Sequence, residues 1–196
     1  MNRSLRIAVA EDEHVMQRYL EETLTELGHK VSIAGTGRDL IDRCKSEPPE
    51  LVITDIRLPD MNGLDAVASV YQEGPVPIIV LSAFHDADLV QRAERDHVLA
   101  YLVKPIKQQD LEPAISIAIS RFQEFRGMQE EADTLRQALE DRKMIERAKG
   151  LLMKRAGLDE PEAFRRLQKL ARDKNQKLVE IAHMIVTAEE AYQAGK

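Results

Sequence analysis

The sequence lacks tryptophan, contains a single cysteine, and has only 4% aromatic residues among its 196 residues. With Cys44 as the only thiol, the chain can form neither an intramolecular disulfide nor a zinc site built from cysteine ligands. No apolar run reaches the ~18 residues that a membrane-spanning helix requires. The first apolar stretch is too short for a signal peptide and leads directly into acidic residues. We therefore expect a cytoplasmic protein with no membrane partner, in a reducing compartment.

The net charge of −6 conceals an uneven distribution of charge along the chain. Residues 142–177 contain 12 Lys and Arg against 5 Asp and Glu, whereas residues 1–121 contain 13 against 20. A basic block inside an acidic protein suggests a polyanionic partner that binds this region alone. The charge count by itself leaves a second possibility equally open, namely a basic helical surface that is simply solvated.

Short apolar runs alternate with helical patterns throughout the first 121 residues. The predicted strands are Leu5–Ala10, Lys30–Ala34, Glu50–Thr54, Val76–Ser82 and Leu99–Val103. The first, third and fourth are almost continuously apolar, as a parallel sheet covered on both faces requires. Helical patterns at 15–28, 37–46, 63–72 and 87–96 separate them. This order predicts an α/β domain, a doubly wound sheet of five βα units.

Charged and polar side chains follow the predicted strands, where such sheets bind their ligands. Glu11 and Asp12 come after the first strand, and Asp55 comes after the third. Clustered carboxylates repel one another unless a cation neutralises them, and oxygen ligands of this kind suit Mg²⁺. We expect Asp12, Asp55 and the backbone carbonyl of Arg57 to hold Mg²⁺, with Glu11 acting through a water molecule.

Three further roles follow from the same edge of the sheet. Asp55 can act as a nucleophile and form an acyl phosphate. Ser82 ends the fourth strand and Lys104 follows the fifth, so both can stabilise charge on phosphoryl oxygens. Each residue alone could be a solvated strand-end group, but the ordered set favours a phosphoryl-transfer site.

The segments "VAEDE", "ITDIRLPDMNG", "LSAF" and "YLVKP" resemble the receiver domain of two-component response regulators over about residues 1–121. The resemblance implies that Asp55 is the phosphoacceptor and that a histidine kinase is the partner. It also implies that Tyr101 is an aromatic switch residue that turns inward together with Ser82. Receivers promote their own phosphorylation and dephosphorylation, but the resemblance implies no enzyme in the usual sense.

A connecting helix is predicted over residues 122–134, with an apolar seam that continues beyond it. Phe125, Met128, Ala132, Leu135 and Leu139 follow one another at steps of 3, 4, 3 and 4, which is a heptad spacing. The seam is short and coiled-coil-like. We expect it to support a homodimer on activation, and the alternative is that the stripe packs within one chain.

The helix-start and helix-end signals in residues 135–196 predict a small bundle of three helices. The first ends at Gly157, a suitable residue just beyond a helix C-terminus. The second begins at Asp159, with Pro161 in its first turn and Glu162 three residues after the cap. The third lies near Gln176–Tyr192. Most of the positive charge falls on the first two helices.

The stretch Leu135–Val186 resembles the ANTAR domain, the RNA-binding output module of antitermination regulators, through Ala148-Lys149-Gly150, Ala163-Phe164 and Asn175. The resemblance implies binding to paired hairpins of a nascent transcript, which prevents a terminator hairpin from forming. Lys and Arg side chains would neutralise its phosphates. The candidate contacts are Arg142, Lys143, Arg147, Lys149, Lys154, Arg155, Arg165, Arg166, Lys169 and Arg172.

Two other output functions remain open for this basic bundle. One is DNA binding, although the third helix is acidic to neutral, which argues against a simple reader of the major groove. The other is an interaction with protein alone. We expect Gly150 to serve close helix packing rather than contact with a ligand.

Overall fold

The computed structural model describes residues 3–83 and 98–194. The chain divides into two compact units, Met1–Arg126 and Gly127–Lys196. The predicted helix at 87–96 lies outside the described residues. The domain limits predicted at residues 121 and 134 stay predictions.

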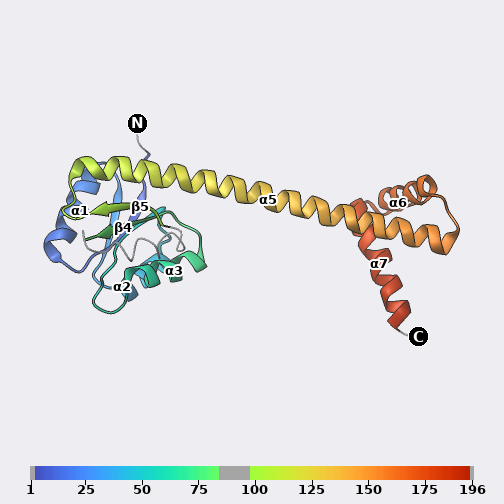
Figure 1. Ribbon diagram of the computed structural model, residues 1–196, viewed down its shortest axis with the longest axis horizontal. Coiled ribbons are helices and arrows are strands. Elements are labelled where there is room, and N and C mark those ends of the chain that lie inside the picture. Colours follow the sequence, from blue (N-terminus) through green and yellow to red (C-terminus); the bar gives the residue numbers. More distant parts are fainter. Residues whose placement is uncertain (1–2, 84–97, 195–196) are drawn as a thin grey trace. The chain divides into compact units, whose positions relative to one another are not determined.

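The first unit contains a parallel five-stranded sheet, shown in Figure 1, with the strand order β2-β1-β3-β4-β5. The strands are β1 (Arg6–Ala10), β2 (Lys30–Ala34), β3 (Leu51–Asp55), β4 (Ile78–Ser82) and β5 (Val98–Val103). The predicted α/β fold and all five strands are confirmed. The order reverses between β1 and β3, and this switch point is where such sheets bind their ligands.

Helices cover both faces of the sheet, which explains why its central strands are apolar on both sides. Helices α2 (Gly37–Ser46) and α3 (Gly63–Glu73) pack on one face. Helix α1 (His14–Glu26) and the first turns of α5 (Gln108–Ala156) pack on the other. Neighbouring residues of β1 illustrate the arrangement, because Ile7 belongs to the second core cluster and Ala8 to the first.

Helix α5 is 49 residues long and belongs to both units. The predicted connector at 122–134 is therefore part of one uninterrupted helix. The side chains of the predicted seam are exposed, with Phe125 at 47%, Met128 at 68%, Leu135 at 60% and Leu139 at 58% of their surface. Among the described residues, no helix combines the length and the apolar character needed to cross a bilayer.

The second unit packs the C-terminal part of α5 against α6 (Glu160–Lys174) and α7 (Leu178–Ala194). The predicted capping box is present, because Asp159 accepts the Glu162 N–H and the Glu162 carboxylate accepts the Asp159 N–H. Gly157, just after α5, has the positive φ of 65° that favours glycine. The core is small and consists of Ala148, Leu167, Ala171, Ile181, Ala182 and Val186. This core joins the three helices of the predicted bundle.

Candidate functional site

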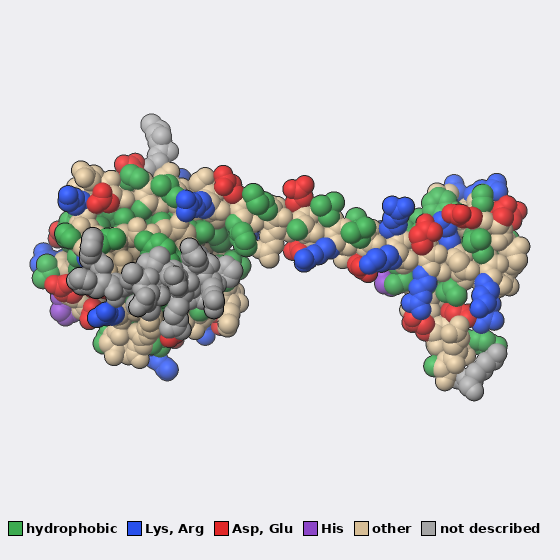
Figure 2. Space-filling view, viewed as in Figure 1, with side chains coloured by type: hydrophobic (Ala, Val, Ile, Leu, Met, Phe, Trp, Pro, Cys, Tyr) green, Lys and Arg blue, Asp and Glu red, His purple; other side chains and the backbone are tan. Residues whose placement is uncertain are grey.

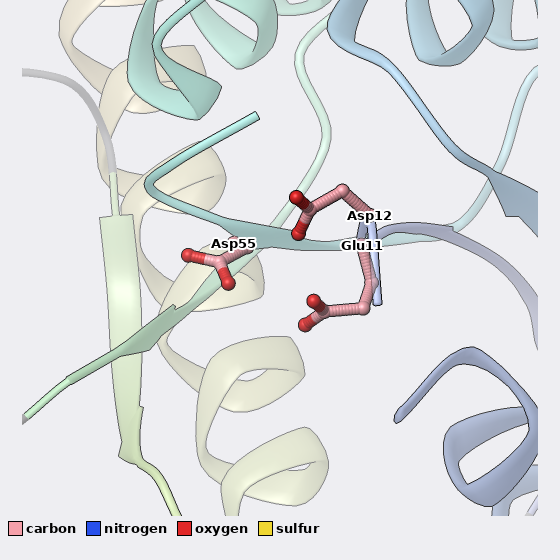
Figure 3. Close-up of side chains that lie close together, drawn as sticks. All are labelled: Glu11, Asp12 and Asp55. Carbon is pink, nitrogen blue, oxygen red and sulfur yellow. The ribbon is translucent and has the colours of Figure 1, made fainter. Parts of the chain in front are cut away.

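Three carboxylates meet at the switch point of the sheet. Glu11 and Asp12 follow β1, and Asp55 is the last residue of β3, the neighbouring strand. One oxygen from each lies within 4.8 Å of the others, and Figure 3 shows the three groups gathered around one space. Glu11 is fully buried and Asp55 is 9% exposed, whereas Asp12 is open to solvent.

Lys104 joins this cluster from the end of β5. Its Nζ donates a hydrogen bond of 2.8 Å to Glu11 Oε2 and a second one to Asp55 Oδ2. Burial raises the pKa of Glu11, although the ammonium group of Lys104 opposes the rise. Burial also acts to lower the pKa of Lys104, but its hydrogen bonds to Asp55 and Glu11 outweigh burial and raise it. The buried negative charge thus has a cationic partner within the chain.

The remaining residues predicted for the phosphoryl site lie around the same edge. The Arg57 N–H donates a 3.0 Å hydrogen bond to Asp55 Oδ1. Ser82 ends β4 and is 4% exposed. Tyr101 pairs with Val80 in the sheet and packs against the core cluster beneath α2 and α3. The donor set of carboxylate oxygens fits Mg²⁺, which prefers oxygen ligands.

The loop after β3 contains two features that the sequence analysis missed. A Cβ atom at Gly63 would lie 1.8 Å from the Asp55 carbonyl oxygen, so only glycine permits this approach. The Asp60 carboxylate accepts the N–H groups of Gly37 and Arg38 at 2.8 and 2.9 Å, which lowers its pKa. The loop that follows Asp55 is therefore held at α3 and at the start of α2. The glycine was visible in "PDMNG", but its contact was not.

Six of the ten candidate RNA contacts in the second unit are exposed and form no ion pair with another described residue. These are Arg142, Lys154, Arg165, Arg166, Lys169 and Arg172. Figure 2 shows Lys and Arg side chains at several places on this unit, with acidic groups between them. The surface is thus mixed in charge, and four of the six cations belong to α6.

Three other candidates are exposed but paired with carboxylates. Lys143 contacts Glu140 at 2.7 Å within α5. Arg147 and Arg155 contact Glu190 and Glu189 of α7 at 2.8 and 2.5 Å. The guanidinium group of Arg155 lowers the pKa of Glu189. The sequence showed that the third helix carries acids, but their pairing with α5 depends on how the helices pack.

Lys149 differs from the other nine candidates, because it is only 7% exposed. Its Nζ donates to Glu146 at 2.9 Å and to Glu160 at 2.7 Å, and it lies 5.8 Å from the centre of the Phe164 ring. The bonds to these carboxylates, first to Glu160, raise its pKa. The structure thus gives Lys149 a packing role between α5 and α6 rather than an exposed position for a phosphate.

The surroundings of Gly150 also differ from the expected close helix packing. It is exposed, and apart from the adjoining backbone of its own helix no atom lies within 4 Å of the position that a Cβ atom would take. The expectation of close helix packing at Gly150 is therefore wrong.

Comparison with known proteins gives both parts of the chain a family. The response regulator receiver domain matches residues 7–116, and the ANTAR domain matches residues 133–186. The transcriptional regulatory protein PdtaR of Mycobacterium tuberculosis is 40% identical over 182 residues, which cover 92% of this chain and 89% of that protein. The chain belongs to the receiver–ANTAR response regulators.

Other relatives of this response regulator match a smaller share of the chain. The regulatory protein LuxO of Vibrio vulnificus is 36% identical over 105 residues, which cover 53% of this chain and 23% of LuxO. The crystal structure of a response regulator receiver domain protein from Clostridium thermocellum is 27% identical, with a TM-score of 0.57. It covers 61% of this chain and 98% of its own. The acidic cluster around Asp55 therefore lies in the receiver part of a response regulator.

Proposed function

We propose that Asp55 receives a phosphoryl group from the phosphohistidine of a histidine kinase. A carboxylate oxygen of Asp55 forms the new P–O bond, while the P–N bond to the imidazole breaks and its electron pair stays on the nitrogen. The observation that carries this proposal is the meeting of Glu11, Asp12, Asp55 and Lys104 at one edge of the sheet.

Each neighbour of Asp55 has a distinct role in this proposal. Asp12, Asp55 and the Arg57 carbonyl would hold Mg²⁺, and Glu11 would act through water. When bound, the ion supplies positive charge to the acidic cluster and to the phosphoryl oxygens. Lys104 exchanges its carboxylate partners for a phosphoryl oxygen, and the Ser82 hydroxyl donates to another.

Tyr101 and Ser82 carry the signal away from the site in this proposal. Ser82 ends β4, the strand beside β3, and Tyr101 lies on β5, on the far side of β4. The Ser82 hydroxyl moves toward the phosphoryl group, and Tyr101 turns inward with it. A Tyr101→Ala variant should still be phosphorylated but should lose the effect of phosphorylation on RNA binding.

Labelling with a small-molecule acyl-phosphate donor tests the acceptor. The wild-type chain should take up label with Mg²⁺ present and lose this reactivity when the metal is chelated. Asp55→Asn should remove the label, whereas Asp65→Asn, at an exposed position on α3, should retain it. Label that persists in Asp55→Asn would show that another residue is the acceptor.

The output proposed for the second unit is RNA binding that leads to transcription antitermination. The support is the ANTAR match over residues 133–186 together with the exposed cations of α5 and α6. Sequence-selective proteins usually recognise RNA in loops with unstacked bases, so we propose paired hairpins of a nascent transcript as the target. Phosphate neutralisation would supply affinity that falls as salt rises. Such a regulator works in the cytoplasm and turns over no separate substrate.

Three probes compared at several salt concentrations test this output. They are an RNA with two neighbouring hairpins, the same RNA with one hairpin deleted, and duplex DNA of equal length. The phosphorylated chain should prefer the paired hairpins. Preference for duplex DNA would make the chain a DNA-binding regulator, and the absence of any binding would favour a protein-interaction output.

Homodimerisation on activation is the third part of the proposal. Phe125, Met128, Leu135 and Leu139 expose apolar surface at heptad spacing on one helix. Light scattering should show a larger mass after phosphorylation, and replacing Leu135 and Leu139 by serine should prevent the increase. An unchanged mass in the phosphorylated wild-type chain would contradict dimerisation.

A further inference from the structure

Gly150 lies in the middle of a basic stripe on the outer face of α5. Lys143, Arg147, Gly150 and Lys154 follow at steps of 4, 3 and 4 residues, which places them on one face of a helix. All four are exposed, and Gly150 has open space where a side chain would lie. Ala148, two residues away, faces the bundle core instead.

Neither the backbone nor the packing of this unit requires glycine at position 150. Its φ is not positive, unlike that of Gly157, so an L-residue could adopt its conformation. A Cβ atom would meet no neighbour outside the helix. Glycine within a helix is less stable than alanine because it loses more backbone freedom on folding. The fold therefore bears a cost at Gly150 that nothing within the described residues explains.

We infer that Gly150 forms a notch in which the sugar–phosphate backbone of the bound RNA approaches α5 closely. This inference rests on the RNA-binding function proposed above and assigns a contact within it. The missing side chain lets the RNA strand approach the helix backbone, and the cations on either side of the notch contact flanking phosphates. Gly150 thereby sets the register of the strand, although it has no charge of its own.

The charges around the notch favour a polyanion over a second copy of this chain. In a parallel symmetric pair of α5 helices joined at Gly150, Lys143, Arg147 and Lys154 would face their own copies, and in an antiparallel pair Arg147 would lie near Lys154 of the other copy, so like charges repel in both cases. Lys154 forms no ion pair with any described residue. The partners of the other two are exposed, with Glu140 at 67% and Glu190 at 55%, and such surface pairs are weak. Phosphates can therefore displace them.

Gly150→Ala and Gly150→Gln in the full chain should affect stability and RNA binding in opposite directions. Both variants should raise the melting temperature of the second unit, because alanine and glutamine are better helix formers than glycine. Both should also weaken binding to the two-hairpin RNA, by about tenfold or more for the longer glutamine, which corresponds to roughly 1.4 kcal/mol. Neither substitution changes the charge, so the salt dependence should stay the same.

Gly127 supplies the matched control on the same helix. It is exposed and has nothing within 4 Å of its Cβ position, but Glu124, Glu130 and Glu131 surround it at helical spacing. Gly127→Ala and Gly127→Gln should stabilise the helix and leave the RNA affinity unchanged. Equal RNA affinity in the Gly150 variants and the wild-type chain would overturn the notch.

Two further results separate this inference from the proposed function. If Gly150→Gln alters only the mass of the chain in light scattering, the face contacts a second copy and the RNA notch is wrong. If the wild-type chain itself binds no RNA, the proposed output fails, and the notch fails with it. If Lys154→Gln weakens RNA binding while both Gly150 variants bind normally, the output stands and the notch alone is refuted.

Discussion

Leu167→Ala should remove a large share of the stability of the second unit, because that unit depends on a very small core. Leu167 is fully buried in α6 and is one of six buried residues in its cluster. Leucine-to-alanine changes at such sites cost about 3 kcal/mol, within a range of roughly 2 to 5. A unit of 70 residues (Gly127–Lys196) has a total stability of roughly 3 to 10 kcal/mol. The substitution therefore removes a large share of the free energy of unfolding.

Urea denaturation followed by circular dichroism measures this loss, and amide hydrogen exchange locates it. Protection should fall in α6 and α7 and should persist in the sheet of the first unit. RNA binding should weaken although every Lys and Arg is retained. Met184→Ala, on α7 at a position that is 44% exposed, is the control and should change stability by less than about 0.5 kcal/mol. A loss below about 1 kcal/mol for Leu167→Ala would refute the role assigned to this core.

Three further predictions concern single side chains. Gly63→Ala should destabilise the first unit by about 3 kcal/mol in urea denaturation, because its Cβ would lie 1.8 Å from the Asp55 carbonyl oxygen; unchanged stability would contradict this contact. Burial lowers the pKa of His29, whose Nδ1 accepts the Leu5 N–H. The stabilising contribution of His29 is therefore complete above about pH 6.5 and is lost as the pH falls through the lowered pKa. His29→Gln should reduce the slope of stability against pH between about 7 and 5, and an unchanged slope would show that His29 does not cause this pH dependence. Lys154→Gln should reduce the slope of log binding constant against log salt concentration by about 0.7 to 0.9 and should leave the melting temperature unchanged. Lys149→Met should lower the melting temperature of the second unit. If Lys149→Met changed only the salt slope and Lys154→Gln only the melting temperature, the roles assigned to these two lysines would be wrong.

The sheet of the first unit could be predicted from local patterns, because each strand is a short apolar run with clear ends. Strand ends still moved by one or two residues, as in β4, which begins at Ile78 rather than Val76. The two prolines near this boundary lack N–H donors, so the ladder begins after them. The residues of the acidic cluster were predictable in the same way, since parallel strands place their carboxyl ends at one edge.

The sequence by itself determined which residues lie at the ends of the strands and helices. Asp55 at a strand end, Asp159 at a helix start and Gly157 beyond a helix end follow from chain position and local geometry alone. These features depend on residues that are neighbours in the chain.

Only the tertiary structure decided which charged groups are available to a ligand. Lys149 and Lys154 are both basic and five residues apart, but packing of α6 buries the first beside Glu160 and leaves the second exposed. The contact between Gly63 and the Asp55 carbonyl, and the open space at Gly150, depend likewise on where other elements lie. Burial and close approach depend on contacts between different segments of the chain. Local sequence patterns therefore could not predict them.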